Sequence, residues 1–142
     1  MKISILCNDL SNKALGRAFV IGKALEKKYE VKIIGPIYGD DIWYPFRHSF
    51  NYVTFKGYYN PFFPLQLKNY LKNIDGELIF AIKPHINSFG VALFLKMTRK
   101  IPLILDIDDW EFGFALSQGF WNMIKIFHQE LIRPEEIGRA HV

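Results

Sequence analysis

Four carboxylates lie within six residues in Asp106–Glu111, which reads Asp-Ile-Asp-Asp-Trp-Glu. Carboxylates this close repel one another if they are buried and ionised. We therefore expect them to face a water-filled crevice, or a ligand that carries hydroxyl groups or positive charge. Trp110 offers an aromatic face that suits a sugar ring. The alternative is a solvated turn in which Asp109 caps the segment that follows.

Two enzyme motifs share part of this string. In D-x-D, aspartates hold a divalent cation and a nucleotide diphosphate, which is sound chemistry for hard oxygen ligands. In the D-x-D-x-T/V motif of one phosphatase class, a nucleophile and an acid/base lie two residues apart. Here Trp110 occupies the position of Thr or Val, and the string follows the fifth predicted strand instead of the first. We therefore expect neither a phosphatase nor a bound metal.

A second polar segment, Lys83–Ser88, also follows a predicted strand. It supplies Lys83, His85 and Asn87, whose hydrogen-bond donors and acceptors suit a hydroxylated or phosphorylated ligand. A lone histidine is more often structural than catalytic, so both roles stay open for His85.

The third polar segment, Cys7–Asn12, precedes a predicted helix. It lacks the G-x-G-x-x-G pattern that lets a backbone approach a pyrophosphate, so we expect no dinucleotide cofactor. The start of the helix still presents free amides and a positive dipole end to an anion. Asn8, Asp9 and, about one turn into the helix, Arg17 are candidate ligand-binding residues. A plain capped turn explains the segment equally well.

Alternating strands and helices must position these segments. Apolar runs predict strands at residues 2–7, 30–35 (closed by Gly35-Pro36), 50–55, 77–82 and 101–106. Apolar periodicity predicts helices at residues 14–25, 63–74, 90–97 and 117–131. The alternation indicates an α/β fold, a Rossmann-like parallel sheet with helices on both faces. The carboxyl ends of its strands would bring the three polar segments into one crevice.

Local signals add detail to the helices. Caps or first turns are expected at Ser11 or Asn12, at Asn60-Pro61, and at Asn87 or Ser88. The third helix is expected to carry Gly90, Leu93, Phe94 and Met97.

The composition limits the classes of protein to which this chain could belong. The chain has 142 residues, 50% of them hydrophobic and 23% charged, which suits one domain with a normal core. No apolar run approaches the roughly 20 residues of a membrane span, and the first strand is too short for a signal peptide. The single cysteine, Cys7, excludes an internal disulfide and fits a reducing compartment, so we expect a cytoplasmic location.

Cations and aromatic rings concentrate in Trp43–Lys72. The net charge is +4, and this stretch contains no Asp or Glu. Such a surface suits an anionic membrane or an anionic substrate. The alternative is that the rings are core residues and the cations form a solvated rim. Because the charge is mild and no known motif accompanies it, nucleic acid is not an expected partner.

Taken together, these segments resemble the N-terminal domain of GT-B glycosyltransferases of family 4, the glycosyl transferases group 1. The resemblance covers residues 1–135 and is carried by KISILCND, LGRAFVIGKALEKKYEVKIIGP and ELIFAIKPHINSFGVALFLKMTRKIPLILDIDDWE. Members of this family pair two Rossmann-like domains, of which the N-terminal one mainly holds the acceptor and the C-terminal one the nucleotide-sugar. They need no metal and retain the anomeric configuration. Their acceptors include glycans and lipid-linked saccharides.

The resemblance implies that this chain is the acceptor-binding half of a retaining glycosyltransferase at the inner membrane face, with a nucleotide-sugar donor as co-substrate and no cofactor. Asp108 and Asp109 would be the catalytic residues that orient the acceptor. The implied acceptor-binding residues are Asn8, Asp9, Arg17, Lys83, His85, Asn87 and Trp110. Many relatives carry His-Glu where this chain has Asp108-Asp109, and an aspartate cannot imitate a neutral imidazole donor. The family's E-x7-E donor motif is absent.

The end of the chain bears on this interpretation. Glu136–Val142 resembles read-through of a sequencing adapter, so we expect residues 1–135 to be part of a longer protein and residues 136–142 an artefact. A genuine polar C-terminus is the alternative. The fragment alone is expected to be inactive, because catalysis requires a donor positioned against the acceptor. The competing hypothesis is a complete, non-catalytic α/β module that binds a polyol or a phosphate.

Overall fold

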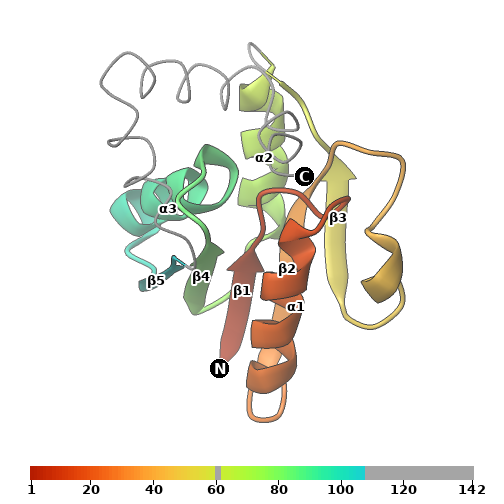
Figure 1. Cartoon of the computed structure of the whole chain (residues 1–142). Coiled ribbons are helices and arrows are strands. Elements are labelled where there is room, and N and C mark those ends of the chain that lie inside the picture. The colour runs from red at the N-terminus through yellow and green to blue at the C-terminus, as the bar shows by residue number, and fades with distance from the viewer. Residues whose placement is uncertain (60–61, 108–142) are drawn as a thin grey trace, which may run out of the picture.

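The structure is a computed structural model that describes residues 1–59 and 62–107. Five parallel strands form one sheet in the order β3-β2-β1-β4-β5 (Figure 1). The strands are β1 (Lys2–Leu6), β2 (Glu30–Ile37), β3 (Tyr52–Lys56), β4 (Leu78–Ile82) and β5 (Leu103–Asp106). The helices are α1 (Ala14–Leu25), α2 (Phe63–Asn73) and α3 (Val91–Arg99), with a 3-10 turn at Tyr44–Phe46 and a π-helical turn at Ile86–Gly90. This arrangement confirms the predicted Rossmann-like α/β fold.

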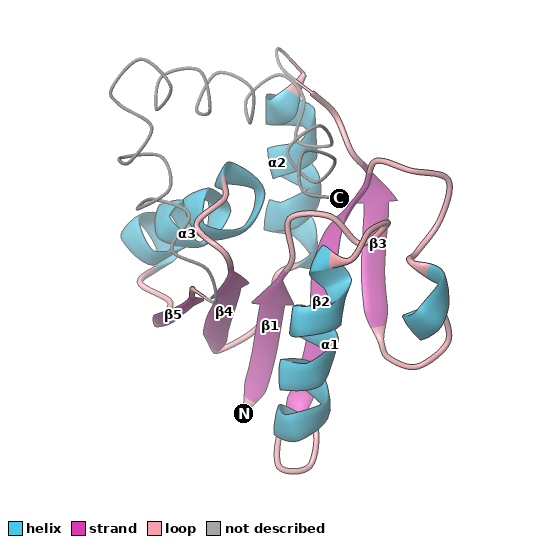
Figure 2. Cartoon of the chain, viewed as in Figure 1, coloured by secondary structure: helices cyan, strands magenta, loops and turns pink. Residues whose placement is uncertain are grey.

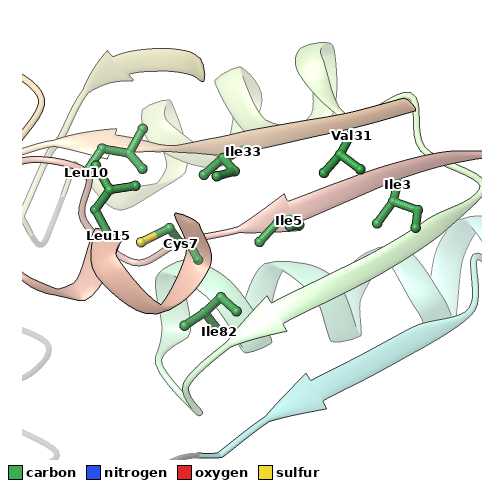
Figure 3. Packing of buried hydrophobic residues seen from close by; sticks show 9 residues of the cluster. Ile3, Ile5, Cys7, Leu10, Leu15, Val31, Ile33 and Ile82 are labelled. Carbon is green, nitrogen blue, oxygen red and sulfur yellow. The ribbon is translucent and has the colours of Figure 1, made fainter. Parts of the chain in front are cut away.

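Each face of the sheet has its own apolar core, because successive side chains of a strand point to opposite faces. On one face, Ile3, Ile5 and Ile33 pack under α1 (Figure 3). On the other face, Leu6 and Ile34 pack with the buried residues of α2 and α3. Figure 2 shows the sheet with α1 passing in front of its strands. Because α1, α2 and α3 follow β1, β3 and β4 in the chain, all three helices begin at the carboxyl edge of the sheet.

β2 extends beyond the predicted stop at Gly35-Pro36 and continues to Ile37. The amide of Ile33 donates to Asn51 O on the β3 side, so the position of Pro36, three residues on, faces β1. Because β1 pairs with β2 only as far as Ile34, the missing N–H of proline removes no ladder bond. Pro36 can therefore continue the strand, and its carbonyl accepts the amide of Leu10.

Two of the three predicted helix starts can be judged. In α1, Asn12 Oδ1 accepts the amide of Ala14 at 2.8 Å, which confirms Asn12 as the residue that satisfies the helix start. The start of α3 was predicted wrongly, because Asn87 and Ser88 lie inside the π-helical turn and neither side chain caps it. For α2, Asn60 and Pro61 lie outside the described residues, and Pro64 is in the first turn of the helix.

The apolar residues that the sequence singles out in α3 are not the ones that pack against the sheet. Val91, Ala92 and Leu95 are buried, whereas Leu93, Phe94 and Met97 are exposed. The amide of Gly90 donates to His85 O, five residues earlier, so the turn that leads into α3 is wider than an α-helical one. Both sets of residues lie at helical spacings within α3, so the sequence offers two apolar stripes, and periodicity alone does not decide which one packs against the sheet. The helix predicted at residues 117–131 lies outside the described residues.

Candidate ligand site at the carboxyl edge of the sheet

The loops after β1 and β4 lie side by side at the carboxyl edge of the sheet. β1 and β4 are neighbouring strands, and the order of the strands reverses between them. In open α/β sheets, ligands bind outside the carboxyl ends of the strands at such a reversal point. The segments that carry Asn8 and Lys83 therefore lie at the edge of the sheet where the sequence predicted a ligand crevice.

Asp9 is only 4% exposed and holds the first of these loops together. Its Oδ1 accepts hydrogen bonds from the amide and the hydroxyl of Ser11, and its Oδ2 accepts one from Asn12 Nδ2 at 2.6 Å. The Ser11 hydroxyl oxygen in turn accepts the amide of Gly39, from the loop after β2. The described contacts thus give Asp9 an organising role in the loop in addition to the predicted role in binding.

Arg17 and Asp106 form a bidentate ion pair across the carboxyl edge. Arg17 Nε and Nη2 each lie 2.8 Å from an Asp106 carboxylate oxygen, which is the fork geometry that guanidinium favours. The Asp106 side chain is 15% exposed and that of Arg17 is 45% exposed. Hydrogen bonding to Arg17 lowers the pKa of Asp106, and although burial opposes this, the charges of Arg17 and Lys83 reinforce it. The ion pair thus holds the Arg17 guanidinium in a fixed position at the carboxyl edge, where the strand order reverses.

Lys83 adopts a left-handed backbone with φ 64°, although it is not a glycine. Its amide donates to Asp106 O, and its carbonyl accepts the Ser88 hydroxyl at 2.9 Å. Such a conformation costs a residue with a β-carbon roughly 1 kcal/mol or more, so it persists only where surrounding contacts impose it. Strained residues concentrate at functional sites, which makes Lys83 a candidate on grounds independent of sequence pattern.

Asn87 belongs to a chain of hydrogen bonds that ties four segments together. Its Nδ2 donates to Tyr38 Oη at 2.7 Å, and the Tyr38 hydroxyl donates to Gln66 Oε1 at 3.1 Å. The amide of Tyr58 donates to the same Gln66 oxygen. Asn87 is 6% exposed, so this network orients a buried amide at the carboxyl edge.

Two buried polar atoms near this edge have no hydrogen-bond partner within the described part of the chain. They are Asn8 Oδ1 and Gln66 Nε2. Proteins leave few such atoms unpaired, because each one costs about 1–3 kcal/mol. An amide oxygen and an amide nitrogen together could accept from and donate to hydroxyl groups.

The structure brings most of the predicted residues to one edge. Asn8, Asp9, Lys83 and Asn87 lie in the loops after β1 and β4, and Arg17 reaches the same edge from α1. His85 precedes the π-helical turn, and its carbonyl accepts the amides of Ser88 and Gly90. The predicted residues Asp108, Asp109 and Trp110 lie outside the described residues.

Three residues of the site were missed as individual candidates. Asp106 was noted only as part of an acidic string, although its place at the end of a strand and the basic Arg17 in a nearby helix were available signals. Tyr38 and Gln66 gave no such signal, because they lie 28 residues apart and meet only through the fold.

The basic and aromatic stretch Trp43–Lys72 is divided between the two faces of the sheet. Trp43, Phe46 and Phe50 pack against the core under α1, whereas Phe55 and the apolar residues of α2 join the opposite core. Most of its rings are thus core residues, which was the alternative reading of the stretch. Arg47 pairs with Asp41, so its charge is compensated.

Comparison of the chain with models of protein families, with curated proteins and with solved structures gives no significant match. Among the residues that the structure describes, no helix is long and apolar enough to cross a membrane. Within the same residues, no group of three or more His, Cys, Asp or Glu side chains is placed to hold a metal ion.

Proposed function

We propose that the chain is the acceptor-binding domain of a retaining glycosyltransferase, which moves a sugar from a nucleotide-sugar to a glycan or a lipid-linked saccharide. The observation that carries the proposal is the convergence of the strained Lys83 and the Arg17–Asp106 pair at the strand-order reversal. Acceptor hydroxyls and the phosphates of lipid-linked saccharides require charged and amide groups of this kind.

Each residue would have a defined task. Lys83 would bind a phosphate or a hydroxyl group of the acceptor, and Asn8 Oδ1 would accept a hydroxyl hydrogen. Asp106 would hold Arg17 in position beside them. Asp108, Asp109, His85 and Trp110 would complete acceptor binding, and the nucleotide-sugar would be held by a second domain outside this chain. The proposal involves no metal.

The binding half of the proposal can be tested on the 142-residue chain. Titration with soluble oligosaccharides and with saccharide phosphates, followed by amide NMR, should move the signals of Asn8, Lys83 and Asn87. Lys83→Gly should weaken binding about tenfold, because it removes a charged donor. Lys100→Gly is the matched control, because Lys100 also has a left-handed backbone, with φ 56°, but lies at the end of α3. This variant should bind the ligands as the wild type does. An equal loss of affinity in both variants, or shifts of amide signals only in other parts of the protein, would contradict this position of the ligand site.

The catalytic half requires the gene to be read beyond codon 135. A protein made from a continuous frame should transfer labelled sugar from a nucleotide-sugar to an acceptor in membrane extracts. If the frame ends at Val142 and the chain binds saccharides or phosphates without transfer, a non-catalytic α/β binding module is the correct assignment. The positive charge of Lys83, which follows β4 at this edge, favours a phosphate as the ligand of that second function.

A further inference from the structure

The outward sides of α2 and α3 carry exposed apolar side chains. Met97 is 75% exposed, and Phe62, next to the start of α2, is 61% exposed. The other exposed apolar residues of this surface are Leu65, Leu93 and Phe94. They lie opposite the buried residues of the same helices, so packing against the sheet does not account for them.

The same surface carries cations and no carboxylate. The exposed cations are Lys68, Lys72, Lys96, Arg99 and Lys100. Residues 42–74 and 78–105 contain no Asp or Glu. The intervening Asp75 and Glu77 lie at the same edge of the sheet as the carboxyl ends of the two helices, but Asp75 is paired with Lys2 and Lys32, and Glu77 with the amino terminus. Within the described residues, none of the five cations takes part in an ion pair with a carboxylate.

The two helices present one continuous surface, which we name the α2–α3 surface. Both helices pack against the same apolar core on one face of the sheet. Arg99 Nη2 of α3 donates to Leu71 O of α2 at 3.2 Å, so the helices touch near their carboxyl ends. The exposed apolar residues Phe62 and Leu65 lie at the amino end of α2, and Lys68 and Lys72 follow them. In α3, Leu93 and Phe94 lie before the cations, whereas Met97 lies between Lys96 and Arg99. Most of the apolar part therefore lies toward the carboxyl edge of the sheet.

We infer that the α2–α3 surface docks on a bilayer of anionic lipid. Apolar side chains that insert at the boundary of the acyl chains, with cations beside them for the phosphates, are the combination that binds an anionic interface. A second copy of this chain fits less well, because two such surfaces would oppose five cations to five with no carboxylate between them. The inference goes beyond the proposed function, since docking on lipid requires no sugar transfer.

The structure changes which residues should touch the lipid. Of the stretch Trp43–Lys72, only Phe62–Lys72 belongs to this surface, because Trp43 and Phe46 pack under α1 on the opposite face. Residues Leu93–Lys100, which lie outside the stretch, supply the other half.

Flotation with vesicles tests the inference on the whole chain. Vesicles of phosphatidylcholine mixed with phosphatidylglycerol should bind the protein, and vesicles of phosphatidylcholine alone should not. The triple variant Lys68→Gln, Lys72→Gln, Lys96→Gln should lose more than tenfold in binding, because each cation near an anionic surface contributes about fivefold. The matched triple variant Lys13→Gln, Lys27→Gln, Lys28→Gln removes the same charge from exposed positions in and around α1, and it should bind nearly as the wild type does.

A second pair of variants tests apolar insertion. Met97→Gln should weaken vesicle binding, whereas Val20→Gln should not, because Val20 is 63% exposed on α1. Equal losses in both triple variants would overturn the inference in favour of a response to net charge alone. Absence of binding to anionic vesicles would also overturn it. So would a concentration-dependent dimer, seen by sedimentation velocity, that Met97→Gln abolishes. Because no saccharide is present, failure here is distinguishable from failure of the proposed function.

Discussion

Arg17 and Asp106 lie 89 residues apart in the chain, yet they form the most sharply defined polar contact at the carboxyl edge. Because the pKa of Asp106 is lowered in the folded state, the pair stabilises the protein above the ordinary pKa of about 4, and this contribution is lost as the pH falls through the lowered value. Since Arg17 is half-exposed, solvent screens the pair. We expect Asp106→Asn to lower the free energy of unfolding at neutral pH by only about 1 kcal/mol.

Urea unfolding of the wild type and of Asp106→Asn, over a series of pH values, checks this prediction. The difference between the two proteins should shrink as the pH falls below about 4, since the wild-type carboxyl then also becomes neutral. Asp40→Asn, at an exposed loop carboxylate, is the control and should change the stability little. A difference that persists at acid pH would show that the substitution acts by packing and not through the charge.

At Cys7 burial dominates, so the pKa of this residue shifts in the opposite direction to that of Asp106. Removal from water raises the pKa of its thiol to about 12, and its Sγ–H donates to Asp9 O. Only the thiolate form of a cysteine attacks the disulfide of a thiol reagent. Cys7 should therefore be labelled no faster than the fold opens and exposes it to water. The rate of labelling should therefore rise with urea in parallel with unfolding. Rapid stoichiometric labelling in buffer would contradict the burial of Cys7 under α1.

At the scale of the element, two glycines of α1 should respond oppositely to alanine. A β-carbon at Gly16 would lie 3.6 Å from Trp43, an ordinary contact, so Gly16→Ala should stabilise by up to about 1 kcal/mol through helix propensity. A β-carbon at Gly22 would lie 2.9 Å from Phe50 and 3.2 Å from Ile33. Overpacking of about 1–3 kcal/mol should exceed the gain in propensity there. Thermal unfolding of both variants measures the signs, and two stabilised variants would refute the proposed contact with Phe50.

The elements also show how far the sequence alone could lead. Buried strands such as Ile3–Leu6 and Ile79–Ile82 are apolar runs too short for a helix, and they alternate with helical patterns, so the parallel sheet was predictable. The site was predictable as an edge, because strand ends define it, and Asn8 and Lys83 do lie there. The strained backbone of Lys83 and the hydrogen bond between Tyr38 and Gln66 could not be predicted, because both depend on contacts between segments that are distant in the chain. The packing face of α3 was not predictable, because the helix carries two apolar stripes and only its contact with the sheet selects Val91, Ala92 and Leu95.

At the scale of the whole molecule, the candidate ligand site and the α2–α3 surface meet at the carboxyl edge, because α2 and α3 both begin there after β3 and β4. If both proposals hold, docking presents the crevice to the lipid surface, and a lipid-linked saccharide engages two sites at once. Two linked contacts raise affinity by about 100-fold or more through effective concentration. We therefore expect a lipid-linked saccharide in anionic vesicles to bind much more tightly than its water-soluble counterpart.

The variants separate the two contacts. The triple variant Lys68→Gln, Lys72→Gln, Lys96→Gln should keep its affinity for the soluble saccharide and lose most of the gain from the lipid anchor. Lys83→Gly should do the reverse, docking on vesicles normally while binding either saccharide weakly. Titration of each variant with the soluble and the vesicle-borne saccharide measures both effects. If the soluble saccharide competes with vesicles for the wild type, the two sites overlap, and the orientation inferred from the starts of α2 and α3 is wrong. If it does not compete and the lipid-linked gain survives in the triple variant, the lipid is held within the crevice itself.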